Sequence, residues 1–284
     1  MLFGTLQKKS GGQNQLFGEK VASLLKELQS DDSSVRQRAA EGLLRAETYD
    51  FKTKGVSEDD QREAALALVL RAKDEIAEVR AAVAYCLGCL GGQPIDSISV
   101  LSELIADKND NVACNALWAA GEVKYRDSDV VRAIVERHQD KSRDIRFRVA
   151  WALAQLSLPN NDVHSAIDKL VRDRDSTVRM YAIEACSNCD HPRIQKLVKR
   201  ALSDRAGEVR GAGCRAIGSN DLPWDRHKKR LLSLAKRDHH GVKLEAVHAL
   251  ITRWPVLTKN PDIRSWMLAN TGYWWVEDAL ERQG

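Results

Sequence analysis

The 284-residue sequence lacks the short motifs that identify common enzyme classes. It has no P-loop, no GxGxxG and no HExxH, and its seven histidines are scattered along the chain. No stretch reaches the ~18 consecutive apolar residues of a membrane-spanning helix. The first residues lack the basic-then-apolar order of a secretory signal, and the six cysteines come without an extracellular cue. We therefore expect a cytoplasmic protein with reduced thiols, no membrane partner, no cofactor and no enzymatic activity.

What the sequence does contain is a repeat. An apolar residue opens an amphipathic segment at near-constant intervals, at Val35, Val79, Val112, Ile145, Val178, Val209 and Val242. The intervals are 44, 33, 33, 33, 31 and 33 residues. A fixed period of this length is typical of a solenoid, in which each unit buries its apolar face only by stacking on its neighbours.

Charged residues recur in the same frame. The residue after the opening apolar one is basic in six units, at Arg36, Arg80, Arg146, Arg179, Arg210 and Lys243, whereas the remaining unit has Ala113. Six residues earlier stands an aspartate in four of these units, at Asp74, Asp140, Asp173 and Asp204. We expect each aspartate to accept N–H groups at the start of a helix. The arginine can reach the aspartate of a neighbouring unit, which predicts a ladder along the stack.

The D-x5-R spacing, as from Asp173 to Arg179, occurs together with partial matches to a V-R-x-x-A-x-x-A-L pattern and resembles HEAT repeats over roughly residues 16 to 253. The resemblance implies an all-α fold, a right-handed α-solenoid of about seven two-helix repeats. We predict a flexible lead at 1–14, a repeat array at 15–255 with an insertion at about 48–59, and capping helices at 256–284. The insertion is interpreted either as a tolerated surface loop or as a partner-binding loop.

The C-terminal segment is rich in aromatic residues, and two interpretations stay open for it. Trp266, Met267, Tyr273, Trp274 and Trp275 are crowded into a short stretch. Terminal repeats of a solenoid have to close an exposed face of the core, which favours a packed cap. The alternative is an exposed aromatic docking patch.

One face of the second helices is the candidate binding surface. With 3.6 residues per turn, the fourth, seventh and eleventh residues of these helices share the face opposite the core, on the concave side of a solenoid. Tyr85, Trp118 and Trp151 occupy the seventh position in three consecutive units. The candidate partner-binding residues are Tyr85, Asn115, Trp118, Glu122, Arg148, Trp151, Gln155, Tyr181, Glu184 and Arg215. The alternative is that the rings fill gaps beside small residues of adjacent helices.

Two CxxC pairs, Cys86/Cys89 and Cys186/Cys189, look like half-sites for zinc. They lie three repeats apart, roughly 30 Å in a stacked array. One tetrahedral metal ion cannot take ligands from both pairs, so we predict no metal site.

The charge is unevenly distributed. Residues 190–260 contain 16 Lys and Arg against 7 Asp and Glu, a net charge of +9 in a chain whose total is +4. The basic face comprises Arg193, Lys196, Lys199, Arg200, Arg226, Lys228, Lys229 and Arg230, on expected first helices and so on the convex side. It is interpreted either as a solvated outer face or as a contact for nucleic-acid phosphate or an acidic protein.

The leading functional hypothesis is a non-enzymatic scaffold that binds a protein partner in its concave groove. Such a protein acts as an adaptor, or as an inhibitor such as an immunity protein that neutralises a toxin. Two alternatives rest on resemblance. A family of DNA glycosylases is similar in using HEAT-like repeats with Trp, Asp and Arg on the concave face, residue types that Trp118, Trp151, Asp144 and Arg148 supply here. The second alternative is a lyase or chaperone for a cofactor-bearing protein, because phycobilin lyases are similar in using HEAT-like repeats.

Overall fold

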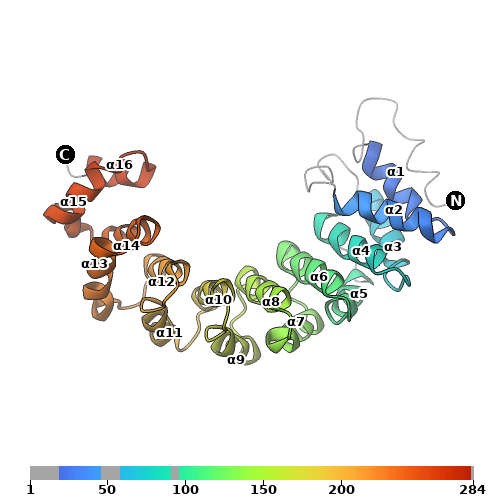
Figure 1. The fold of residues 1–284 in the computed structure, drawn as a ribbon, viewed down its shortest axis with the longest axis horizontal. Coiled ribbons are helices and arrows are strands. Elements are labelled where there is room, and N and C mark those ends of the chain that lie inside the picture. Colours follow the sequence, from blue (N-terminus) through green and yellow to red (C-terminus); the bar gives the residue numbers. More distant parts are fainter. Residues whose placement is uncertain (1–18, 46–57, 91–95, 283–284) are drawn as a thin grey trace. The chain divides into compact units, whose positions relative to one another are not determined.

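A computed structural model describes residues 19–45, 58–90 and 96–282, and every regular element in these ranges is a helix. The helices pack in sequence order, which confirms the predicted all-α solenoid. The chain divides into two compact units, unit 1 (residues 1–156) and unit 2 (residues 157–284) (Figure 1). The predicted lead at 1–14 and residues 48–57 of the predicted insertion lie outside the described residues.

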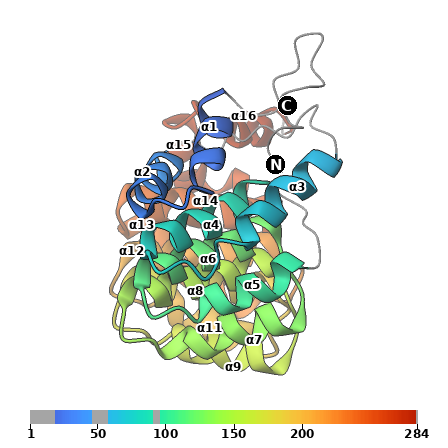
Figure 2. The same cartoon turned by 90° about the vertical axis from the view of Figure 1, so that its right-hand side faces the viewer.

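Unit 1 consists of helix pairs, each with a first and a second helix. The first helices are α1 (Glu19–Glu27), α3 (Glu58–Val69), α5 (Asp96–Ile105) and α7 (Ser128–Glu136), the last followed by the short 3-10 helix η3 (Arg137–Gln139). The second helices are α2 (Ser33–Leu44), α4 (Ala77–Leu90), α6 (Asp110–Val123) and α8 (Arg143–Leu156). The second helices stack on one another in order, and Figure 2 shows α4, α6 and α8 in succession with α5 and α7 beside them.

Unit 2 repeats this arrangement. Its first helices are α9 (Asn161–Leu170), α11 (Ile194–Ala201) and α13 (Lys228–Arg237), the last preceded by the 3-10 helix η4 (Asp225–His227). Its second helices are α10 (Ser176–Asn188), α12 (Gly207–Ser219) and α14 (His240–Arg253), and they also stack in order. The chain continues through η5 (Pro255–Lys259), α15 (Pro261–Leu268) and α16 (Trp274–Glu281).

The layer of second helices and the layer of first helices differ in the side chains through which they pack. Second helices meet through small side chains, such as Ala119 of α6 and Ala152 of α8, which are fully buried and let the helices approach closely. First helices are strongly amphipathic. On α11, Leu197 and Val198 are buried while Lys196 is exposed. The second helices therefore form a tightly packed layer, and the first helices carry much of the charged surface.

The repeated aspartate closes the turn between the two helices of a pair. Asp173 accepts the N–H of Asp175 at 2.9 Å. Asp175 is then the residue that caps α10, because it accepts the N–H groups of Thr177 and Val178 at 3.0 and 3.2 Å. The predicted acceptor role of the aspartate is confirmed, but its N–H partner lies in the turn, and the cap that satisfies the helix start comes two residues later.

The repeated arginine joins adjacent repeats as predicted. Nη1 of Arg210 donates to the carbonyls of Asp204 and Arg205 at 2.8 and 2.9 Å, while Nε and Nη2 donate to the carboxylate of Asp238 at 2.7 and 2.6 Å. Hydrogen bonds from Arg210 hold the pKa of Asp238 below its usual value, against the opposing effect of burial. The same pairing recurs in Arg36–Asp74, Arg80–Asp107 and Arg179–Asp204. Each rung fixes both a turn and the offset between two repeats.

Ala113 interrupts the arginine series on α6, and Arg137 of the next repeat takes its place. Nη1 of Arg137 donates to the carbonyls of Ile105 and Asp107 at 2.6 and 3.2 Å, and Nε donates to the carboxylate of Asp140 at 2.9 Å. By analogy with the other rungs, an arginine at position 113 would donate to the Asp107 carbonyl and the Asp140 carboxylate. The ladder is therefore continued here by a residue from outside the repeated position.

The C-terminal aromatics are mostly packed together. The ring of Trp275 lies 4.7 Å from that of His248 on α14, 6.2 Å from Trp266 and 6.1 Å from Tyr273, measured between ring centroids. Trp274, by contrast, is 76% exposed. The cluster agrees with the packed-cap interpretation, while Trp274 stays on the surface.

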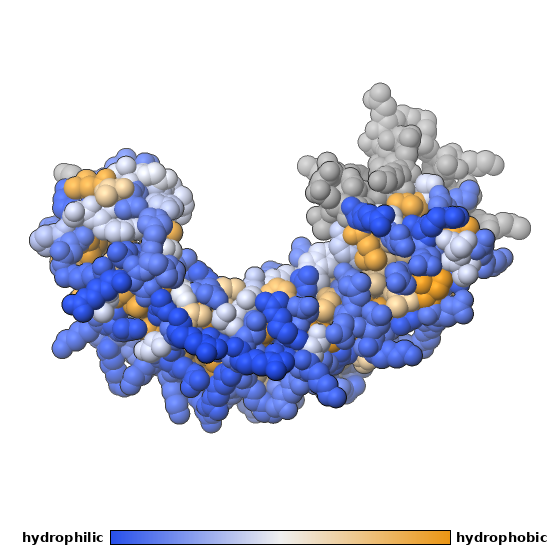
Figure 3. All heavy atoms as spheres, in the orientation of Figure 1, coloured by the Kyte–Doolittle hydropathy of each residue, from blue (hydrophilic) through white to orange (hydrophobic). Residues whose placement is uncertain are grey.

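The visible surface is largely hydrophilic. In the space-filling view, the surface at α7 of unit 1 and at α9 and α11 of unit 2 is mostly blue, and hydrophobic residues show in separate patches (Figure 3). Among the described residues, none of the helices combines the length and hydrophobicity that a membrane-spanning segment requires.

Candidate functional site

Tyr85, Trp118 and Trp151 form a row on the second helices of unit 1, here called the aromatic row. They occupy the same position on α4, α6 and α8, which stack in that order. All three side chains are half-buried, so the prediction that this position is exposed is only partly right. Helical periodicity predicted the face on which the rings lie, but the adjacent helix covers part of each ring.

A glycine on the preceding helix provides the space for each tryptophan. A methyl group added at Gly88 of α4 would lie 2.6 Å from Cζ3 of Trp118, and one added at Gly121 of α6 would lie 2.5 Å from Cζ3 of Trp151. Ordinary carbon–carbon contacts are about 3.5–4.0 Å. Each indole therefore occupies space that any side chain at the glycine would need.

The two glycines were missed at the sequence level, although the sequence contains a signal. Each stands three residues after an aromatic residue of its own helix, as in Tyr85-x-x-Gly88 and Trp118-x-x-Gly121. The rings of Tyr85 and Trp118 are stacked, with centroids 5.1 Å apart and an angle of 25° between their planes. These contacts agree with the gap-filling interpretation, and the part of each ring that stays exposed keeps a surface available.

Polar residues surround the aromatic row. Asn115 is half-buried and donates through its side-chain amide to the carbonyl of Asn111 at 2.9 Å, and Glu122 is exposed. The guanidinium carbon of Arg148 lies 5.3 Å from the ring centroid of Phe147. Gln155, one turn after Trp151 on α8, is half-buried. The row thus combines apolar rings with amide, carboxylate and guanidinium groups.

Asp144, the acidic residue of the comparison with DNA glycosylases, lies at the start of α8. Its side chain is 70% exposed and accepts a hydrogen bond from Arg143 at 2.8 Å. An exposed, paired carboxylate does not have the environment that prepares an acid or base for catalysis.

In unit 2, two of the predicted binding residues are engaged within the protein. Arg215 of α12 donates to Glu184 of α10 at 2.6 Å and to Glu245 of α14 at 3.0 Å. Burial acts to lower the pKa of Arg215, but the two carboxylates outweigh it and raise that pKa above the usual value. Tyr181 is half-buried on α10. Glu245 was not among the predicted residues, and the three charges link all three second helices of unit 2.

The cysteines do not assemble a site in the part of the chain that the structure describes. All six thiols are free, and no group of three or more His, Cys, Asp or Glu residues is placed to hold a metal ion. Burial raises the pKa of Cys86 well above its usual value and that of Cys89 to about 12. Thiols with raised pKa values are poor nucleophiles and poor metal ligands at neutral pH.

The geometry described so far can be compared with known proteins. The family model for HEAT repeats matches residues 21–113, 98–171 and 163–251. The chain belongs to the HEAT-repeat family. A comparison with curated proteins finds no match.

Several solved structures share the HEAT-like fold. One engineered protein superposes with a TM-score of 0.57 at 19% identity, covering 83% of this chain and 68% of that chain. Another gives 0.53 at 19% identity, covering 70% and 95%. The complex of CpcE and CpcF of phycocyanin lyase from Nostoc sp. PCC7120 gives 0.51 at 16% identity, covering 97% and 98%. At these identities the likeness shows the fold alone.

The basic face of this HEAT-repeat protein lies on the first-helix layer of unit 2, as predicted. Lys196, Lys199 and Arg200 are exposed on α11, and Arg193 immediately precedes that helix. The remaining members are Arg226 on η4 and Lys228, Lys229 and Arg230 on α13. Lys228 is half-buried, and its ammonium lies 5.3 Å from the ring centroid of Trp254.

Proposed function

We propose that this HEAT-repeat protein binds a protein partner through the face of unit 1 that is centred on the aromatic row. The observation that carries the proposal is the row itself, three half-exposed aromatic rings at the same position of three stacked helices. At roughly 10 Å per repeat, the row extends about 20 Å. Tryptophan, tyrosine and arginine are the residues most enriched at energetic hot spots of protein interfaces.

The rings are held in place before any partner binds. Gly88 and Gly121 leave space that the indoles of Trp118 and Trp151 fill, and Tyr85 stacks on Trp118. A side chain that is already fixed loses little conformational entropy on binding, so more of its contact energy appears as affinity. The same ring can therefore pack against the preceding helix with one part and offer its exposed part to a partner.

The proposed role is non-enzymatic. Asp144 beside the row is exposed and paired with Arg143, so it has no feature of a catalytic acid. A rigid surface of aromatic and polar residues suits recognition of a folded or extended protein segment. An adaptor and an inhibitor, including an immunity protein that neutralises a toxin, both meet this description.

The experiment compares wild type with two row variants, Trp118→Ala/Trp151→Ala and Arg148→Glu. The variants are used to capture partners from the native source, and the retained protein is then purified and its Kd measured. We expect the double tryptophan variant to weaken binding at least tenfold, or about 1.4 kcal/mol. Arg148→Glu reverses the charge beside the row without opening a cavity in the core, and its folding is checked in the same way as that of the double variant.

The matched control is Trp274→Ala, which removes an exposed tryptophan of unit 2. It is expected to bind like wild type, and far-UV circular dichroism checks that all variants are folded. Equal affinity of wild type and the folded double tryptophan variant would refute the proposal. Equal losses in the double variant and in Trp274→Ala would also refute it, because binding would then depend on general aromatic exposure.

A further inference from the structure

Unit 2 contains a groove that the aromatic row does not involve. It has a volume of about 1230 Å³ and lies between α11 and the segment that leads from the end of α12 into α13. Five cationic side chains line it, namely Arg193, Lys196, Lys199, Arg226 and Arg230. They come from two first helices and their leading turns, so the fold brings together two basic clusters that are separated in the sequence.

Most of this positive charge is uncompensated. Arg193 pairs with Asp168 at 2.8 Å, and Nε of Arg230 donates to the carbonyl of Leu202 at 3.0 Å. For Lys196, Lys199 and Arg226, the described part of the chain offers no carboxylate within ion-pair distance. Cations gathered in a concavity produce a stronger local potential than the same cations on a flat surface.

A buried histidine lies beside these cations. His227 lies at the base of the groove, where its ring nitrogen is 3.3 Å from the carbonyl of Gln195. Burial lowers the pKa of His227 below its usual value, and the charges of Lys199 and Arg226 lower it further. The histidine therefore leaves the positive charge of the groove to the lysines and arginines.

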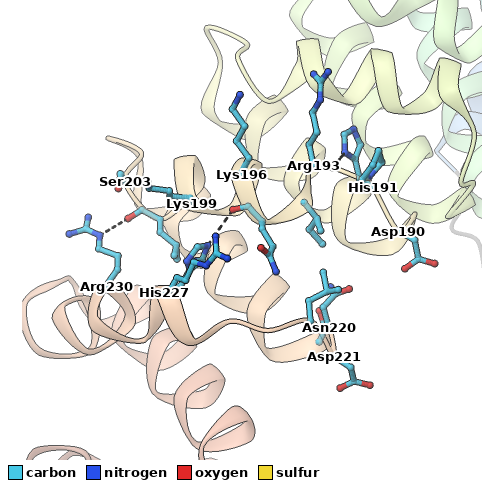
Figure 4. Close-up of a pocket in the computed structure, with 17 residues that line it drawn as sticks. Asp190, His191, Arg193, Lys196, Lys199, Ser203, Asn220, Asp221, His227 and Arg230 are labelled. Carbon is cyan, nitrogen blue, oxygen red and sulfur yellow. Dashed lines mark hydrogen bonds between the residues drawn. The ribbon is translucent and has the colours of Figure 1, made fainter.

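The two ends of the groove differ in charge. Figure 4 shows Asp190 and Asp221 at one end and Arg230 at the other, with Lys196 and Lys199 between them on α11. Leu222, which also lines the groove, is 40% exposed and offers an apolar contact near the acidic end. The arrangement distinguishes the two ends of a bound chain, because an anionic segment fits only the part away from Asp190 and Asp221.

We propose that this groove binds an acidic segment of a partner protein in extended conformation, with its carboxylates on Lys196, Lys199 and Arg226. Carboxylates bound by lysine and arginine form charge-assisted hydrogen bonds, which are stronger than neutral ones. The groove and the aromatic row lie in different units, so either site can fail its test while the other stands.

A protein segment fits the groove better than a nucleic acid does. Single-stranded nucleic acid binds grooves that combine positive charge with exposed aromatic rings on which bases stack. Trp224, which follows Leu222 closely in the sequence, is only 2% exposed and donates its indole N–H to the carbonyl of Asn220 at 3.0 Å. The carboxylates of Asp190 and Asp221 would also repel a continuous phosphate backbone.

The test uses the full chain and three fluorescein-labelled probes, which are a peptide with six consecutive glutamates, the same peptide with glutamines, and a twelve-residue oligothymidine. Binding is measured by fluorescence anisotropy at low and at moderate salt. We expect the glutamate peptide to bind at least tenfold more tightly than the glutamine peptide, with an affinity that falls as salt is added.

Two triple variants with the same net charge locate the site. Lys196→Gln/Lys199→Gln/Arg226→Gln removes the unpaired groove cations. Arg200→Gln/Arg205→Gln/Lys229→Gln removes three exposed cations of unit 2 that do not line the groove. We expect the groove variant to lose at least tenfold in affinity for the glutamate peptide and the control variant to lose less than threefold.

Three results would overturn the proposal. Equal losses in the two triple variants would mean that the peptide responds to net charge alone. Groove-dependent binding of oligothymidine that is as tight as that of the glutamate peptide would assign the groove to nucleic acid. Absence of peptide binding to wild type at low salt would remove the site altogether. Failure of the aromatic-row variants to lose their partner would affect none of these outcomes.

Discussion

Replacing Gly121 with alanine tests whether a missing side chain holds the indole of Trp151. The new Cβ would lie 2.5 Å from Cζ3 and 3.1 Å from Cε3 of Trp151, so the ring has to move by about 1 Å to restore ordinary contacts. Alanine is intrinsically favoured over glycine inside a helix by about 0.5–1 kcal/mol. Overpacking costs about 1–3 kcal/mol. We expect the clash to cancel or exceed the helix gain.

A double-mutant cycle separates the two effects. In the Trp151→Ala background the clash with the ring is absent, so Gly121→Ala is expected to be less destabilising than in wild type, with a helix gain of at most about 1 kcal/mol. The nearest remaining atom is the backbone Cα of Ala152 at 3.2 Å, a tight contact that offsets part of this gain. The coupling between Gly121 and Trp151 is therefore expected to be about 1–3 kcal/mol.

Gly218 provides a matched control at the same repeat position of α12. Its added Cβ would meet Cα of Ala249 at 3.7 Å, an ordinary contact, so Gly218→Ala is expected to stabilise the protein by about 0.5–1 kcal/mol. The assay is urea denaturation followed by far-UV circular dichroism, comparing midpoint and slope. If Gly121→Ala stabilises the protein as much as Gly218→Ala does, the glycine does not hold the ring and the reasoning is refuted.

Two further predictions concern the arginine–aspartate ladder. Arg137→Ala should lower the free energy of unfolding, measured by urea denaturation, by about 1.5–3 kcal/mol. Adding Ala113→Arg to this variant should recover part of the loss. No recovery would mean that Arg137 does not replace the missing ladder arginine. Hydrogen bonds from Arg210 lower the pKa of Asp238 in the folded state, while burial opposes this shift. The contribution of Asp238 to the free energy of unfolding is therefore complete above its unfolded pKa of about 3.9, and it is lost as the pH falls through the folded pKa. Asp238→Asn should therefore destabilise the protein at pH 7, with a difference from wild type that shrinks below about pH 4; a difference that stays constant with pH would contradict this assignment.

The sequence predicted the repeat, its two layers and the existence of an arginine–aspartate ladder, because these depend on periodicity and on residues at fixed positions. It did not predict that Arg137 replaces the ladder arginine missing at Ala113. Arg137 lies outside the repeated position, and only the three-dimensional arrangement of the helices brings it close to its acceptors. The sequence also assigned the acidic partner of the ladder a capping role that Asp175 fulfils in the α10 repeat. Local spacing does not show which of two nearby aspartates faces the helix start.

The candidate site was predicted as a face rather than as a set of contacts. Periodicity placed Trp118 and Trp151 on the correct side of their helices. How deeply each ring is buried depends on the distance to the next helix, which Gly88 and Gly121 set. The link between Arg215 and Glu245 likewise depends on the offset between α12 and α14. The groove on α11 and α13 joins residues that no single periodic pattern connects.

The bonds of Arg137 determine where this chain can be divided into modules. Most repeats carry their own ladder arginine, as the α3–α4 repeat does with Arg80. The α5–α6 repeat carries Ala113 and obtains its donor from the end of α7. A duplication or transplant of the α5–α6 repeat alone would leave the carbonyls of Ile105 and Asp107 in one copy without this donor, and a deletion of the repeat would leave Arg137 without these two acceptors. In this stretch the smallest self-sufficient building block is therefore a pair of repeats, from α5 to α8.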